Sequence, residues 1–148
     1  MLSPDHHGPV EYLVLEFPGE AVGPDLAPAL AELTASGAVR ILDLVYMHKD
    51  AAGGVRWYEA DEAESPDPDV AHLLDEERCD LLSEADLASA ADALAPATCG
   101  CMVVVENVWE ARLEDAVRKA HGRVAADERV VRDQVAAALR YAAQALEA

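Results

Sequence analysis

Hydrophobic and polar positions follow the same order twice along the chain. In each copy an apolar run with a glutamate near its end leads into an amphipathic stretch, a glycine and a second extended run. The first copy comprises Tyr12–Phe17, Leu26–Leu33, Gly37 and Val39–Met47, and the second comprises Cys101–Glu106, Trp109–Ala120, Gly122 and Arg123–Val130. Short apolar runs bounded by turn residues are typical of strands, and a 3.6-residue apolar spacing is typical of helices. The pattern predicts two strand–helix–strand (βαβ) units, which interleave into a ferredoxin-like α+β sandwich.

Between the two copies the sequence predicts a hairpin and a further helix. Val39–His48 and Val55–Ala60 flank the turn-rich residues 49–54, so the second strand extends the sheet at its edge. An acidic loop (61–69) and a short helix (70–78) follow. Ser83 and Asp86 then have the spacing of a capping box, which predicts a helix that ends before the next proline.

A final helix is predicted at the end of the chain, where apolar residues recur on one stripe: Val131, Val135, Leu139, Ala142 and Leu146. We therefore divide the chain into a flexible lead-in (1–10), the α+β domain (11–130) and a C-terminal helix (131–148).

The expected sheet is antiparallel, with Tyr12–Phe17 and Cys101–Glu106 at its centre and the helices of both βαβ units on one face. Alternation along the strands then places the following side chains on the opposite face: Tyr12, Val14, Glu16, Leu42, Leu44, Tyr46, Met102, Val104 and Glu106. A face this apolar is not left in water. We expect it to be covered by the C-terminal helix of the same chain or by a second subunit.

The amino-acid composition argues against several classes of binding partner and cellular location. With 29 acidic and 11 basic residues the formal net charge is −18, which disfavours binding to nucleic acid or to an anionic membrane surface. No apolar run approaches the roughly 20 residues that span a bilayer. The N-terminus lacks the pattern of a signal peptide, and three cysteines do not form a disulfide framework. The sequence therefore predicts a cytoplasmic protein.

Few residues carry candidate chemistry, and no catalytic motif is present. Glu16 and Glu106 are the only pair that suggests acid–base catalysis, but antiparallel central strands would place them toward opposite ends of the sheet. Cys99 and Cys101 lie on one side of an extended segment and, with His121, are weak candidates for a metal site. Buried free cysteines are the commoner alternative. We predict no cofactor.

Tyr46, His48, Trp57 and Tyr58 fall on the two strands of the predicted hairpin. Aromatic side chains beside a histidine are suited to holding a small ligand at the sheet edge. Cross-strand packing of an edge hairpin explains the same residues without any ligand.

Five segments resemble a family of small actinobacterial proteins that is known only as a domain of unknown function. They are Gly8–Phe17, Val39–Val45, Lys49-Asp50, Leu82–Asp86 and Val103–Trp109, and the resemblance extends over residues 8–130. A wider family of unknown function is similar but has a glycine-rich insertion, where this chain has the acidic residues 61–80. The resemblance implies the same fold, with no known activity and no catalytic residues.

Two functions follow as hypotheses. The first is a non-catalytic module that acts through homo-oligomeric assembly or as an accessory to another protein. The second is a small-molecule binder or cofactor-free enzyme of the dimeric α/β-barrel type, with a pocket near Tyr46, His48 and Trp57.

Overall fold

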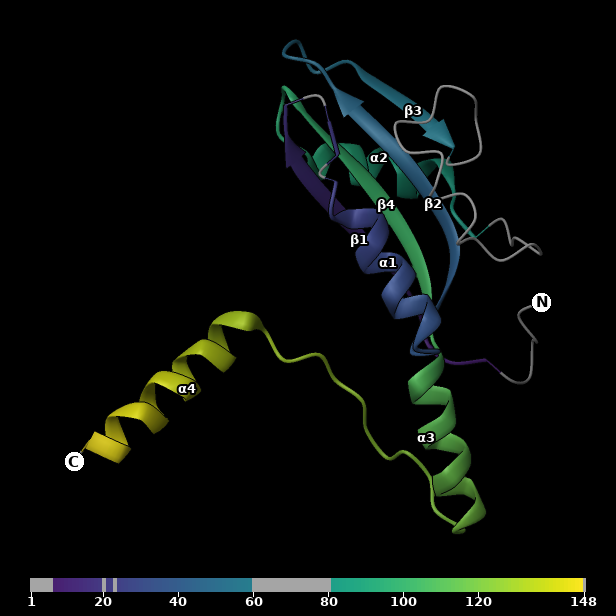
Figure 1. The fold of residues 1–148 in the computed structure, drawn as a ribbon, viewed down its shortest axis with the longest axis vertical. Coiled ribbons are helices and arrows are strands. Elements are labelled where there is room, and N and C mark those ends of the chain that lie inside the picture. The colour runs from purple at the N-terminus through teal and green to yellow at the C-terminus, as the bar shows by residue number, and fades with distance from the viewer. Residues whose placement is uncertain (1–6, 20, 23, 60–80, 148) are drawn as a thin grey trace. The chain divides into compact units, whose positions relative to one another are not determined.

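The computed structural model describes residues 7–19, 21–22, 24–59 and 81–147 (Figure 1). The predicted loop 61–69 and short helix 70–78 lie outside these residues. In chain order the elements are β1 (Val10–Pro18), α1 (Leu26–Ala35), β2 (Val39–Lys49), β3 (Val55–Glu59), α2 (Glu84–Ala93), β4 (Thr98–Asn107), α3 (Val108–Lys119) and α4 (Arg132–Glu147). The predicted α+β class, the edge hairpin and the C-terminal helix are confirmed.

The strands form one antiparallel sheet in the order β1-β4-β2-β3. Since β4 is antiparallel to both β1 and β2, those two strands run parallel to each other with β4 between them. β1, α1 and β2 therefore form a split βαβ unit of the expected kind. The hairpin partner β3 extends the sheet beyond β2, as the sequence predicted.

One irregularity in β2 changes which side chains share a face. The pairing of β2 with β4 shifts between Ile41 and Asp43, so one residue is inserted at that point. Beyond the shift Leu44 and Tyr46 lie on the same face as Ile41, packed in the cluster that includes Leu30 of α1. The prediction that Leu44 and Tyr46 face the opposite side was wrong, because alternation was continued through the irregularity.

Helix α1 covers one face of the sheet. Gly37, the glycine of the first copy of the pattern, adopts a φ of +76° directly after the helix, a conformation that commonly ends helices at glycine. The buried core on this side combines α1 with the two central strands: Leu30, Ile41, Leu44, Tyr46, Cys101, Val103 and Val105.

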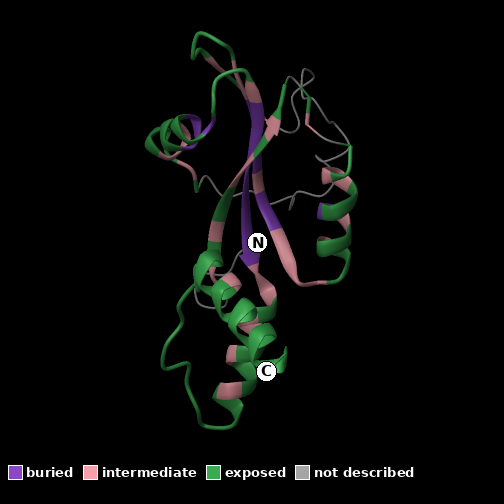
Figure 2. Ribbon diagram, turned by 90° about the vertical axis from the view of Figure 1, so that its left-hand side faces the viewer, coloured by how far each residue is buried: buried purple, intermediate pink, exposed green. Residues whose placement is uncertain are grey.

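Helix α2 lies on the opposite face (Figure 2). It begins at the predicted capping box, where the Ser83 hydroxyl accepts from the Asp86 N–H and the Asp86 carboxylate accepts from the Ser83 N–H. Ala90 and Leu94 pack there against two methionines, Met47 and Met102. The second apolar face is thus covered in part by α2, which corrects the expectation that only the C-terminal helix or another subunit could cover it.

The second βαβ unit is not completed. The strand predicted at Arg123–Val130 was wrong, because these residues form no strand and are all exposed. They include Ala125, Ala126, Asp127 and Glu128, residue types that are depleted in strands. Since no strand of the described residues flanks it, β1 lies at an edge of the sheet instead of at its centre.

The chain divides into two compact units, residues 1–115 and residues 116–148. The first contains the sheet, α1, α2 and the start of α3. The second contains the end of α3, the connecting residues and α4. This boundary lies within α3, whereas the sequence-based division placed it after residue 130.

Candidate functional site

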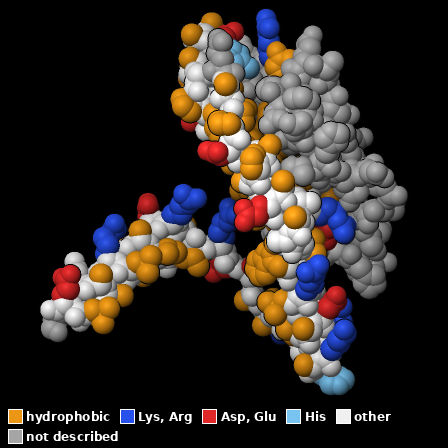
Figure 3. All heavy atoms as spheres, viewed as in Figure 1, with side chains coloured by type: hydrophobic (Ala, Val, Ile, Leu, Met, Phe, Trp, Pro, Cys, Tyr) orange, Lys and Arg blue, Asp and Glu red, His pale blue; other side chains and the backbone are white. Residues whose placement is uncertain are grey.

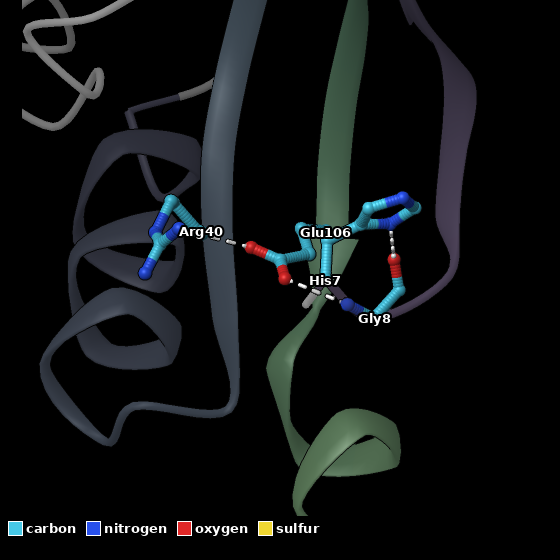
Figure 4. A network of polar contacts seen from close by, with 4 residues as sticks. All are labelled: His7, Gly8, Arg40 and Glu106. Carbon is cyan, nitrogen blue, oxygen red and sulfur yellow. Dashed lines mark hydrogen bonds and ion pairs between the residues drawn. The ribbon is translucent and has the colours of Figure 1, made fainter. Parts of the chain in front are cut away.

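Glu106 is the one buried charged side chain among the described residues, with an exposed fraction of 4%. Its Oε2 accepts a hydrogen bond of 2.8 Å from the backbone N–H of Gly8, and its Oε1 lies 3.2 Å from Nη1 of Arg40 (Figure 4). The contact with Arg40 is an ion pair without the alignment of a hydrogen bond. A buried carboxylate needs such partners to offset its lost hydration. Glu106 therefore links β4 to β2 and to the residues before β1.

The lead-in to β1 is held to the sheet before the strand begins. In addition to the Gly8 contact, the backbone N–H of Asn107 donates to the Pro9 carbonyl at 2.8 Å. A side chain at Gly8 would collide with the Asn107 carbonyl. Residues 8 and 9 are thus part of the ordered domain, although the sequence-based division began the domain at residue 11.

Glu16 lies near the other end of the same pair of strands. It is opposite Gly100 on β4, whereas Glu106 is opposite Val10, so six residues of β4 separate the two levels. At about 3.4 Å per residue this is a separation of roughly 20 Å. The Glu16 carboxylate accepts from the Ala95 N–H at 2.7 Å, and each glutamate binds a separate backbone segment. The two carboxylates are too far apart to act on one substrate atom.

The four aromatic and histidine candidates are divided between the two faces of the sheet. Tyr46 pairs with Tyr58 across the hairpin, and His48 lies two residues further along the same face. Trp57 is opposite Met47 and packs with the α2 cluster on the other face. The structure therefore places Tyr46, His48 and Tyr58 on one face of the sheet, where Tyr46 is buried in the core against α1, and it places Trp57 on the other face.

Cys99 and Cys101 are both buried and face α1. Burial raises the pKa of the Cys99 thiol. Burial, with a smaller contribution from the neighbouring Cys99, raises the pKa of Cys101 to about 12. Because the thiolate is the nucleophile and the metal ligand, the raised pKa of both thiols disfavours either role.

The remaining metal candidate, His121, belongs to the C-terminal unit, and its backbone has a φ of +64° just after α3. In the described ranges no group of three His, Cys, Asp or Glu side chains is placed to hold a metal ion. The same ranges contain no helix with the length and apolar character that spanning a bilayer requires.

Most of the exposed large apolar side chains lie in three places. On the sheet they lie on β1, where Tyr12 is 47% and Leu13 38% exposed. On α3 they are Trp109 and Leu113, with exposed fractions of 51% and 56%. The C-terminal unit carries a further set, which we call the C-terminal apolar stripe: Val131, Val135, Leu139 and Leu146. Figure 3 shows hydrophobic side chains gathered on α3 and along α4.

The exposed edge of β1 was missed by sequence reasoning, because the predicted strand 123–130 covered it. The only signal available was the alanine and acidic content of that segment, which disfavours a strand.

These features define a class of protein, a small α+β domain with a buried carboxylate and buried thiols in structural environments. Most of its exposed large apolar side chains lie on β1, on α3 and in the C-terminal unit. The chain belongs to the Family of unknown function (DUF6325), which it matches over residues 6–147. This confirms the resemblance to a domain of unknown function. No curated protein matches the chain significantly, and no solved structure does so.

Proposed function

We propose that this protein is a non-catalytic module that acts through homo-oligomeric assembly, as a scaffold or as an accessory to another protein. The observation that carries the proposal is the set of large apolar side chains exposed on β1, α3 and α4. Contiguous apolar patches mark interaction surfaces, and Figure 3 shows hydrophobic side chains gathered on α3 and along α4. Trp109 adds weight, because tryptophan is enriched where proteins bind one another.

Helix α4 supports the same proposal by its own energetics. It has 16 residues, and none of its side chains is buried. In proteins most of the stability of a helix comes from the packing of its apolar face. The C-terminal apolar stripe provides such a face, and assembly would stabilise the helix by burying it.

The net charge of the protein determines how the strength of assembly should depend on salt. A net charge of −18 on each copy opposes association through long-range repulsion. Salt screens this repulsion and leaves apolar contacts intact. Association driven by apolar contacts is therefore expected to strengthen as the salt concentration rises, whereas association driven by salt bridges would weaken.

The test is native mass spectrometry of the untagged full chain, with sedimentation velocity at low and high salt. A dimer or larger oligomer of unmodified chains, strengthened by salt, supports the proposal. The matched variants lie on one helix: Trp109→Ala and Leu113→Ala should weaken the oligomer, and Arg112→Ala, also exposed, should not. A chain that stays monomeric at high micromolar concentration in high salt would contradict the proposal.

A small-molecule site near the hairpin is the second candidate, and the grouping of Tyr46, His48 and Tyr58 on one face supports it. Such a binder or cofactor-free enzyme would carry a reproducible extra mass in the same spectra. His48→Ala should then release that mass, while Trp57→Ala, on the other face, should retain it.

Three further properties remain predictions from the sequence: a cytoplasmic location, an actinobacterial source, and kinship with the wider family that has a glycine-rich insertion.

A further inference from the structure

The outer side of β1 has the properties of a strand acceptor. β1 pairs with β4 over nine consecutive residues without a bulge, and no strand of the described residues lies on its other side. Edge strands are ordinarily protected by charged side chains, above all lysine, by bulges, by proline or by short length. The two charged side chains of β1, Glu11 and Glu16, are each hydrogen-bonded to another segment of the chain. β1 contains no lysine or arginine, and its one proline, Pro18, is the last residue. Tyr12 and Leu13 are exposed along it.

The topology of the sheet indicates which segment would fit this edge. After β1, helix α1 leads to β2, which is parallel to β1 and separated from it by one strand. After β4, helix α3 begins a second connection of the same kind. By the same rule its next strand would be parallel to β4 and would lie just outside β1. The residues that follow α3 include 123–130, which form neither a helix nor a strand in the single chain and are all exposed.

The connection between β4 and α3 favours a second copy as the acceptor. Seven residues (19–25) separate β1 from α1, but α3 starts at Val108, directly after the last residue of β4, Asn107. A helix that folds back on its own sheet ordinarily needs a connection of 2–6 residues. Because β4 and α3 have no such connection, the residues after α3 reach the β1 edge of another molecule more readily than that of their own chain. Exchange of identical segments is a common route to dimers.

A second copy could instead pair its own β1 with this edge. The charges of the two segments favour residues 123–130 over β1. Pairing two β1 strands would bring four glutamates, Glu11 and Glu16 from each copy, to one seam that contains no basic residue. Like charges on neighbouring strands are destabilising. Residues 123–130 carry Arg123 and Arg129 beside two acidic residues, so they add no net charge to the edge.

We infer that residues 123–130 of a second copy add to the outer side of β1 as a fifth strand, and that two copies exchange these segments reciprocally. This inference rests on the proposed homo-oligomer and names the surface that forms it. The exchange closes as a two-fold dimer, in which each chain both donates and accepts a strand.

Two adjacent proline substitutions in the full chain test the strand. Only alternate N–H groups of a strand point to its neighbour. Of Ala125→Pro and Ala126→Pro, one therefore removes a hydrogen bond to β1 and the other an N–H that faces water. We expect one variant to weaken the dimer about tenfold or more and its neighbour to have little effect. Equal small effects, or equal losses, would show that the segment is not a strand in the dimer.

Cross-linking identifies the chain that donates the strand. A dihydrazide linker joins carboxylates, and an equal mixture of ¹⁴N- and ¹⁵N-labelled protein distinguishes links between copies from links within one copy. We expect links from Glu11 or Glu16 to Asp127 or Glu128 that pair the two isotopes. If every such link joined two peptides of the same isotope, with no mixed pairs, the segment would lie on its own sheet and the inference would be overturned. A dimer that shows neither these links nor the proline alternation would also overturn it, while leaving the proposed assembly intact. A monomer would instead overturn the assembly itself.

Discussion

The carboxylate of Glu106 accepts a hydrogen bond from the backbone N–H of Gly8, a residue 98 positions earlier in the chain. The contact joins the end of β4 to the residues just before β1, and Arg40 adds an ion pair from β2. One buried side chain thus ties three segments of the sheet together at the end where α3 begins. A residue that the sequence presented as a catalytic candidate has the surroundings of a structural one.

Glu106→Ala should lower the free energy of unfolding by about 2 kcal/mol, because it leaves the Gly8 N–H without its acceptor in a buried position. Glu106→Gln retains an acceptor for Gly8 and should lose less. The control is Glu16→Ala, which removes an exposed carboxylate and should cost about 1 kcal/mol or less. Urea denaturation measures all three, and equal losses for Glu106→Ala and Glu16→Ala would contradict this account.

Lys49 anchors the C-terminal end of α2. Its Nζ donates to the carbonyls of Ala91 and Leu94, both at 3.0 Å. The last turn of α2 contains no basic residue of its own. A cation at this position satisfies terminal carbonyls and complements the helix dipole. Lys49→Met should therefore lower the free energy of unfolding by about 1 kcal/mol. It should also speed hydrogen exchange at the end of α2 more than at Ser83, where the capping box is unchanged. Uniform exchange along the helix would indicate that Lys49 does not anchor it.

The elements of the fold were largely predictable from sequence because they depend on local patterns. The capping box at Ser83 and Asp86 depends on a few neighbouring residues and occurs as predicted. The glycine expected between the first amphipathic stretch and the next strand, Gly37, lies directly after α1. The faces of the sheet were less predictable. One inserted residue near Leu42 exchanged the sides of Leu44 and Tyr46, and nothing in the local sequence marks that shift.

The arrangement of the helices and the candidate site depended on contacts between distant residues. Helix α2 packs through the small residue Ala90 beside Leu94, and a segment rich in alanine does not indicate which face of a sheet it will cover. Trp57 was grouped with Tyr46 because both lie on the hairpin, yet the register between β2 and β3 sends them to opposite faces. Register is set by the whole ladder of pairing, which a single strand does not reveal.

The raised pKa of Cys101 makes stability depend on pH in the alkaline range. In the unfolded chain this thiol ionises near its ordinary pKa of 9.0, while in the folded chain it stays protonated up to about 12. The folded state then binds more protons above pH 9, so its stability falls as the pH rises through this window and is unaffected below it. The loss attributable to Cys101 should approach about 1.4 kcal/mol per pH unit. Cys101→Ala should remove this part of the slope in urea denaturation at pH values on either side of 9. If the free energy of unfolding fell equally steeply with pH in Cys101→Ala and in the unsubstituted protein, Cys101 would not be the source of the pH dependence.

Trp109 offers a direct optical test of the surface on which assembly is proposed to depend. The chain has two tryptophans, and Trp57→Phe leaves Trp109, half exposed at the start of α3, as the only one. If assembly covers α3, the emission of this variant should shift to shorter wavelength as the protein concentration rises, because the indole leaves water. Trp109→Phe is the matched control, since it reports Trp57 in the α2 cluster, whose surroundings should not change with concentration. Emission from Trp109 that stays constant while sedimentation shows an oligomer would place the interface elsewhere and remove α3 from it.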